Sequence, residues 1–267
     1  MTGRCLGRVL IIAGSDSGGG AGVQADIKTV TALGGYASSA ITAVTVQNTL
    51  GVSAVHPIPV EVVIAQARAV LDDIGADVIK LGMLGDIRVV EAVATLLSEA
   101  GVPAVIDPVM IAKGGEALLE PGALDAMRTR LIPQAALLTP NAPEAAALTG
   151  LVVETTDDLR RAGEALLGLG ARAVLMKGGH IDGRILTDIL MTPSGETLFT
   201  GPRIETRHTH GTGCTLASAC AVGLAQGLSL DAAVARAWAY VAEAIRRAPG
   251  LGAGHGPLDH AWPMRDG

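Results

Sequence analysis

The stretch VLIIAGSDSGGGAGVQADIKTVTAL, residues 9–33, contains the pattern that decides the fold. Residues 9–13 form a short apolar run rich in branched side chains, which indicates a β-strand. Residues 21–33 have the apolar spacing of a helix, and four glycines lie between the two segments. A strand, a short loop and a helix in this order are the repeating unit of α/β proteins.

The same alternation continues along the chain. Further strands are predicted at residues 40–47, 51–58, 77–80, 104–106, 136–138 and 173–176, with a hairpin at 184–191 and 196–200. Further helices are predicted at residues 60–72, 87–100, 121–130, 143–149, 156–169, 213–226 and 230–247. This order predicts a mostly parallel sheet covered by helices on both faces. No linker, charge run or internal repeat divides the chain, so we expect a single domain over residues 1–267.

Composition and charge exclude several classes of protein. Hydrophobic residues make up 49% of the 267 residues, aromatic residues only 2%, and the net charge is −6, which disfavours nucleic-acid binding. We expect neither a membrane span nor a signal peptide. Cys214 and Cys220 would lie about 9 Å apart on one helix, too far for a disulfide. With Cys5 as the third cysteine, we expect reduced thiols and a cytoplasmic protein.

The glycine-rich loop after the first strand, AGSDSGGGAG at residues 13–22, is a candidate ligand site. In parallel sheets ligands bind at the carboxyl ends of strands, and glycines let the backbone approach them closely. Its glycines match neither the dinucleotide-binding fingerprint nor the Walker phosphate loop. A flexible loop without a ligand remains the alternative.

The segment THGTGCT, residues 209–215, places Cys214 behind Gly-Thr-Gly where a long helix is expected to begin. A helix N-terminus offers N–H groups and a positive dipole to an anion, and it lowers the pKa of a thiol. Cys214 could therefore act as a nucleophile, accept a proton beside a bound phosphate, or only pack well.

Polar residues of two other segments follow predicted strands. In TPNAPE, Asn141 and Glu144 are spaced to hold a hydrated magnesium ion, although the same spacing fits a helix capping box better. In MKGGH, Lys177 could neutralise phosphate oxygens or be an ordinary surface lysine. Together with the anion site, these residues suggest phosphoryl transfer from a nucleotide.

Seven segments resemble, in order and spacing, the hydroxymethylpyrimidine/phosphomethylpyrimidine kinases of thiamin biosynthesis, which belong to the ribokinase-like superfamily. They are IAGSDSGGGAGVQADIKT, ITAVTVQNT, IKLGML, DPVM, TPNAPEAAALTG, LMKGGH and THGTGCT. Bacterial pyridoxal kinases of the same branch share the GTGC ending and the N-x-x-E element. The segments AGSD, QNT and GML therefore favour the pyrimidine kinases.

The resemblance implies a three-layer α/β/α fold and the ATP-dependent phosphorylation of 4-amino-5-hydroxymethyl-2-methylpyrimidine and of its monophosphate. It implies that Cys214 accepts the substrate proton and that Lys177 handles phosphate. The other implied residues surround the pyrimidine (Gly14, Asp16, Gln47, Met83), line the phosphate loop (His210, Gly211, Thr212, Gly213), or organise Mg²⁺ and its waters (Asp107, Asn141, Glu144). We also expect a homodimer.

Three alternatives remain open. The first is a pyridoxal or pyridoxine kinase of the same branch. The second is a cysteine-dependent hydrolase that uses Cys214 with His210 and needs no ATP. The third is a nucleotide- or vitamin-binding regulatory module without catalysis, which the presence of Lys177 and Cys214 disfavours.

Overall fold

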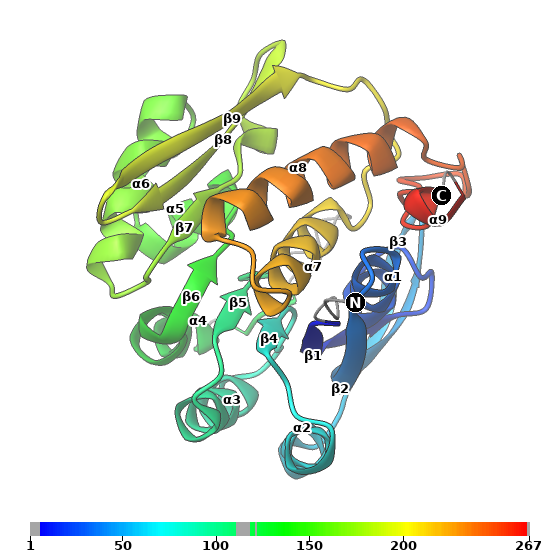
Figure 1. The fold of residues 1–267 in the computed structure, drawn as a ribbon, viewed down its shortest axis with the longest axis vertical. Coiled ribbons are helices and arrows are strands. Elements are labelled where there is room, and N and C mark those ends of the chain that lie inside the picture. Colours follow the sequence, from blue (N-terminus) through cyan, green and yellow to red (C-terminus); the bar gives the residue numbers. More distant parts are fainter. Residues whose placement is uncertain (1–5, 111–117, 121, 266–267) are drawn as a thin grey trace, which may run out of the picture.

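The computed structural model describes residues 6–110, 118–120 and 122–265. Its strands form one nine-stranded sheet in the order β3-β2-β1-β4-β5-β6-β7-β8-β9 (Figure 1). The pairs from β2 through β7 are parallel, whereas β2–β3, β7–β8 and β8–β9 are antiparallel. The predicted mostly parallel sheet is therefore confirmed.

The strands are β1 Arg8–Asp16, β2 Tyr36–Asn48, β3 Gly51–Pro57, β4 Val78–Leu81, β5 Ala104–Ile106, β6 Ala135–Leu138, β7 Val174–Met176, β8 Ile185–Thr192 and β9 Gly195–Pro202. The α-helices are α1 Gly22–Ala32, α2 Val60–Asp73, α3 Ile87–Ala100, α4 Ala123–Ala126, α5 Ala142–Thr149, α6 Thr156–Gly168, α7 Thr212–Ala225, α8 Leu230–Arg246 and α9 Trp262–Arg265.

Helices cover both faces of the sheet, which confirms the α/β/α sandwich. Alternate side chains of β1 enter two different cores, because successive residues of a strand point to opposite faces. Val9 and Ile11 belong to the core that includes residues of α1, α7 and α8, while Leu10 and Ile12 belong to the core that includes residues of α2, α3, α5 and α6. Helix α7 is buried along most of its length between the sheet and α8, which explains its nearly unbroken apolar sequence (Figure 1).

The first strand is longer than the sequence predicts. β1 continues past Ala13 to Asp16 because its ladder with β2 resumes at Ser15 after an irregularity at Gly14. This extension places Asp16 at the carboxyl end of the strand. β2 likewise begins at Tyr36, earlier than the predicted residue 40.

The sequence predicts one continuous helix at residues 121–130, and for the described residues this prediction is wrong. Pro121 lies outside the described residues, as does Cys5. The segment contains the short helix α4, then a π-helical turn at Met127–Leu131 and a 3₁₀ turn at Ile132–Gln134. Pro133 has no N–H to donate to the preceding turn, so a regular α-helix cannot continue through it.

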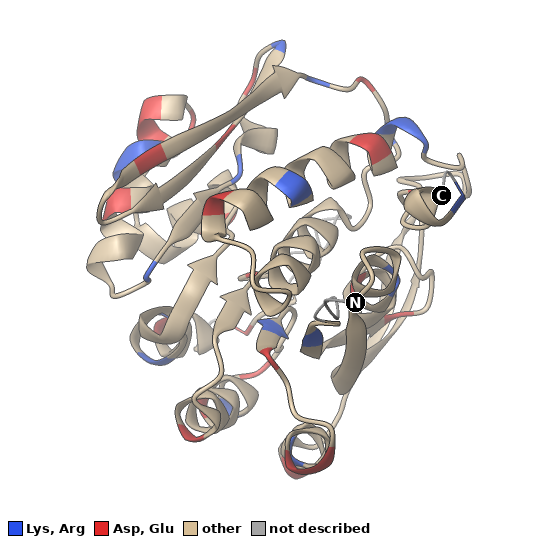
Figure 2. Ribbon diagram, in the orientation of Figure 1, with Lys and Arg blue, Asp and Glu red and all other residues tan. Residues whose placement is uncertain are grey.

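Positive and negative residues are mixed over the ribbon, without a large region of one sign (Figure 2). Within the described ranges, no helix is both long and apolar enough to cross a bilayer.

Candidate active site

The predicted site residues gather at the carboxyl edge of the sheet. Asp107 directly follows β5, Lys177 directly follows β7, and Asn141 lies between β6 and α5. Because β5, β6 and β7 are neighbours in the sheet, these three residues meet although they are far apart in the sequence. This edge is where parallel sheets bind ligands.

Lys177 is the centre of a charged cluster at this edge. Its Nζ lies 2.9 Å from Asp107 Oδ1 and 3.7 Å from Glu144 Oε2, and all three side chains are largely buried. Burial opposes the charge on Lys177, but the two carboxylates raise its pKa above the ordinary value. The amine is therefore a cation that phosphate oxygens can share.

Asn141 and Glu144 form the capping box that their spacing favours. Asn141 Oδ1 accepts the Glu144 N–H at 2.9 Å, and Glu144 Oε2 accepts the Asn141 N–H at 2.7 Å. Burial raises the pKa of Glu144 to about 7, with Asp107 adding to the rise and Lys177 opposing it. The capping interpretation is confirmed.

A metal bound directly by several side chains does not fit this cluster. The described part of the chain contains no group of three or more His, Cys, Asp and Glu side chains suited to a metal ion. Among the described contacts, Asp107 Oδ2 and Glu144 Oε1 accept no hydrogen bond from the protein. Two free oxygens fit a magnesium ion that keeps most of its waters.

The glycine loop before α7 is packed tightly against the first glycine-rich loop. Gly211 has a φ of 83°, and a Cβ there would lie 1.8 Å from the Gly20 carbonyl oxygen, so only glycine fits. A Cβ on Gly213 would lie 3.1 Å from Lys177 Nζ. The N-terminal turn of α7, whose first N–H groups have no partner within the helix, therefore lies beside the Lys177 amine, an arrangement suited to an anion.

Cys214 is the third residue of α7, but its thiol does not have the lowered pKa that the sequence suggests. Burial, with smaller contributions from the Asp26 and Asp107 carboxylates, raises the pKa of Cys214 to about 12, although Lys80 and the Gly22 backbone oppose the rise. Desolvation thus outweighs the helix N-terminus in the ligand-free protein. The thiol is protonated at neutral pH in this state.

The four residues expected around a pyrimidine lie on β1, β2 and the loop after β4. Gly14 faces Met83 so closely that a Cβ would lie 2.4 Å from the Met83 Cε. Gln47 Oε1 accepts a hydrogen bond from Thr45 Oγ1 at 3.0 Å, which fixes the orientation of the amide. A hollow of about 340 Å³ opens beside Gln47 at the β2–β3 turn.

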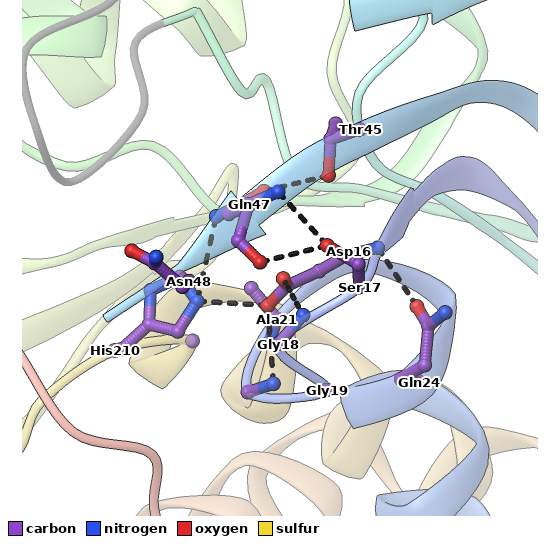
Figure 3. A network of polar contacts seen from close by, with 12 residues as sticks. Asp16, Ser17, Gly18, Gly19, Ala21, Gln24, Thr45, Gln47, Asn48 and His210 are labelled. Atoms are coloured by element: carbon purple, nitrogen blue, oxygen red, sulfur yellow. Dashed lines mark hydrogen bonds and ion pairs between the residues drawn. The ribbon is translucent and has the colours of Figure 1, made fainter. Parts of the chain in front are cut away.

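Asp16 holds the glycine-rich loop in place (Figure 3). Its Oδ1 accepts the Gly18 N–H, and its Oδ2 accepts the N–H groups of Gly20 and Ala21. Burial alone would raise the pKa of Asp16, but hydrogen bonds from His210 and the loop lower it. Asp16 therefore shapes the loop that would surround a ligand.

His210 directly precedes Gly211, but its side chain lies beside Asp16 and Gln47, two of the residues expected around a pyrimidine. Its Nε2 is 2.8 Å from Asp16 Oδ2 and 3.5 Å from Gln47 Nε2 (Figure 3). Its main-chain N–H donates to the Gly256 carbonyl at 3.1 Å, so it is engaged within the protein. The structure thus joins the glycine-rich loop, β2 and the segment before α7 through one histidine.

Sequence reasoning missed a buried charge pair next to the site. Lys80 on β4 binds both carboxylate oxygens of Asp26 on α1, and Ser218 on α7 also donates to Asp26. The signal was present in the sequence: VIKL places a lysine inside a central strand, where a charge requires a partner.

A parallel sheet with a lysine–carboxylate cluster and a glycine-led helix N-terminus at its carboxyl edge defines a ribokinase-like small-molecule kinase. The family model described as phosphomethylpyrimidine kinase matches residues 16–259. The chain belongs to the phosphomethylpyrimidine kinase family.

Relatives and solved structures agree with this assignment. The chain is 52% identical to the hydroxymethylpyrimidine/phosphomethylpyrimidine kinase of Streptomyces coelicolor, with 96% of this chain and 95% of the relative covered. It is similar to the phosphomethylpyrimidine kinase of Clostridium difficile (TM-score 0.80, 41% identity, 90% and 99% covered). It is also similar to an ADP complex of Bacillus subtilis pyridoxal kinase (TM-score 0.90, 34% identity, 97% and 99% covered).

Proposed function

We propose that the protein transfers the γ-phosphoryl group of ATP to 4-amino-5-hydroxymethyl-2-methylpyrimidine and then to its monophosphate, as in thiamin biosynthesis. The observation that carries the proposal is the meeting of Lys177 with the N-terminus of α7, where Gly213 adjoins the Lys177 amine and Cys214 follows. The names of the relatives support the choice of substrate. Phosphorus NMR of a reaction with ATP should show a monophosphate ester followed by a diphosphate; consumption of neither pyrimidine would refute the proposal.

In this proposal the chain positions the phosphates and moves one proton. Lys177 and the α7 N–H groups bind the transferring phosphoryl, where their charge is already in place before reaction. Cys214 accepts the proton of the attacking hydroxyl, which requires the thiol to ionise when substrates are bound. A covalent role for Cys214 has less support, because His210, the candidate base four residues before it, pairs with Asp16.

A magnesium ion with several waters would be held by the free oxygens of Asp107 and Glu144, beside Asn141. Bound there, it would neutralise phosphate charge.

Glu144→Gln tests whether Glu144 helps to hold magnesium. Because Gln also suits a capping box, the melting temperature should change little, whereas the magnesium concentration for half-maximal rate should rise several-fold. Thr155→Ser, at the exposed cap of α6, is the control. An unchanged magnesium titration would mean that Glu144 only caps α5.

Gln47 is proposed to pair with the aminopyrimidine edge, since an amide offers both a donor and an acceptor. Gln47→Leu should leave a polar group of the ligand unpaired and weaken substrate binding by about 1–3 kcal/mol. The effect should appear in KM for the pyrimidine, with KM for ATP nearly unchanged. If KM for the pyrimidine stays at the wild-type value, Gln47 is structural.

A second candidate is pyridoxal kinase activity. It is favoured by the similarity to pyridoxal kinases of known structure, one of them solved with an ATP analogue and pyridoxal at a TM-score of 0.89. The lower identity, 35% against 52% for the pyrimidine kinase relative, places this activity second.

The chain is further proposed to work as a single-domain, cytoplasmic homodimer. Val44, Val46 and Val55 are exposed apolar side chains of the outer strands β2 and β3, and a second copy would cover them. The free thiols of Cys214 and Cys220 support a reducing compartment. Sedimentation equilibrium should give twice the chain mass; a monomer at micromolar concentration would contradict the dimer.

A further inference from the structure

One imidazole nitrogen contacts both Asp16 and Gln47, two residues from different strands. His210 Nε2 lies 2.8 Å from Asp16 Oδ2 and 3.5 Å from Gln47 Nε2 (Figure 3). The side chains of His210 and Asp16 are 9% and 3% exposed, so water has little access to the pair. Whether this nitrogen donates or accepts a hydrogen bond therefore decides what the Gln47 amide can do.

The hydrogen on His210 Nε2 can be assigned from its partners. The two oxygens of Asp16 already accept main-chain N–H groups of the glycine-rich loop, as an ionised carboxylate does, and such a group can only accept. At 2.8 Å from Asp16 Oδ2, His210 Nε2 must therefore carry a hydrogen and donate it. A ring nitrogen that donates has no lone pair with which to accept, so Gln47 Nε2 cannot donate to it.

The remaining contacts of Gln47 fix the residue but do not use its amide nitrogen. The Ser17 hydroxyl accepts from the main-chain N–H of Gln47 at 2.8 Å and donates to its carbonyl oxygen at 2.7 Å. Gln47 Oε1 lies 3.0 Å from Thr45 Oγ1. Among the described contacts Gln47 Nε2 has no acceptor, because His210 Nε2 is itself a donor. The amide hydrogens of Gln47 are thus available to a ligand.

The imidazole is held in place by two other segments. The His210 N–H donates to the Gly256 carbonyl at 3.1 Å, next to a β-bridge between His210 and Pro257. A Cβ on Gly20 would lie 2.5 Å from His210 Cδ2, so the ring rests directly on the glycine-rich loop. Turning the ring away from Asp16 would require one of these segments to move.

We propose that His210 is a positioning residue for substrate recognition: by donating to Asp16, it keeps the Gln47 amide nitrogen free to donate to the substrate ring. Without the imidazole, the Asp16 carboxylate would be open to Gln47 Nε2, and a charged acceptor binds an amide more strongly than a neutral ring nitrogen does. The inference rests on the proposed function for the identity of the ring, an aminopyrimidine whose ring nitrogens accept hydrogen bonds.

His210→Phe tests the inference, because it removes the donor and keeps an aromatic ring. Calorimetric titration of the nucleotide-free protein with hydroxymethylpyrimidine should give a Kd raised about tenfold, as for the loss of one hydrogen bond. KM for the pyrimidine should rise in parallel, with kcat and KM for ATP within about twofold of the wild type. His210→Gln, whose amide nitrogen can donate to Asp16, should restore most of the binding.

A double-mutant cycle with Gln47→Leu shows whether His210 acts through Gln47. In the Gln47→Leu background, His210→Phe should raise Kd little further. His255→Phe is the matched control, because His255 is exposed and its ring contacts the Arg207 carbonyl; its Kd should equal that of the wild type. An unchanged Kd in a folded His210→Phe, or an equal loss in both backgrounds, overturns the inference.

A measurement on the wild type serves if the His210 variants do not fold. Nitrogen–proton correlation NMR of the histidine side chains should show a hydrogen on His210 Nε2 in the ligand-free protein, and a bare Nε2 overturns the inference. A wild-type protein that shows the expected binding pattern but releases no ADP would overturn the proposed function alone. ADP release by a protein with a bare His210 Nε2 would overturn the inference alone.

Discussion

Cys214→Ala is expected to lower kcat by about 10²–10⁴-fold, the usual loss when a proton acceptor is removed. The α7 N–H groups and Lys177 remain in this variant, so KM for ATP should change little. Cys214→Asp should recover part of the lost rate, because a carboxylate can accept the same proton. A covalent nucleophile would not be replaced in this way.

The control for this pair of variants is Cys220→Ala, which removes a thiol six residues further along the same helix. Cys220 is completely buried in the core beneath the site, and its loss should cost some stability without a comparable loss of kcat. Circular dichroism of all three variants separates lost catalysis from lost folding. Nearly full activity in Cys214→Ala would show that phosphate positioning alone carries the reaction.

Lys177→Met should have the second largest effect. It removes the cation that adjoins the α7 N-terminus, and we expect kcat/KM for ATP to fall by about 10²–10³-fold, as for the loss of one charge-stabilising donor. It also leaves Asp107 and Glu144 without their cation, which should lower the free energy of unfolding by about 3 kcal/mol. Steady-state kinetics and urea denaturation measure the two effects separately.

Lys177→Arg separates the effect of the positive charge at residue 177 from the effect of where that charge is placed. Arginine keeps the cation and should recover most of the stability, but its planar fork cannot place the charge where the ammonium was. Activity should therefore stay well below that of the wild type. Arg68→Met, which breaks the exposed ion pair with Glu99 between α2 and α3, is the surface control. Wild-type kinetics in a folded Lys177→Met would remove Lys177 from the mechanism.

Local signals explain why parts of the fold could be predicted from the sequence. Helix α3 has the predicted bounds because Asp86 caps its first turn and Gly101 ends it in the left-handed conformation. The length of β1 could not be predicted, because Ser15 and Asp16 are held by pairing with β2, a contact between distant segments.

Some features of the candidate site could likewise be predicted from the sequence, whereas others depend on how distant segments pack. Strand-end position made Lys177 a candidate phosphate ligand, whereas Asp107 was a candidate only through the family resemblance. The two side chains meet because β5, β6 and β7 lie side by side and end at the same edge of the sheet. The pairing of His210 with Asp16 depends on how two loops pack, and no spacing in the sequence records it. The raised pKa of Cys214 reflects the burial of its thiol, with the charge of Asp26 adding to the rise, and only the folded chain creates these surroundings.

The most direct test of the central claim is ADP release by the wild-type protein with Mg²⁺ and ATP, compared across three acceptors. These are hydroxymethylpyrimidine, its monophosphate and pyridoxal. We predict ADP release with both pyrimidines, and a kcat/KM for hydroxymethylpyrimidine at least tenfold above that for pyridoxal. No ADP release with either pyrimidine in a folded sample, or a preference for pyridoxal, would contradict the claim.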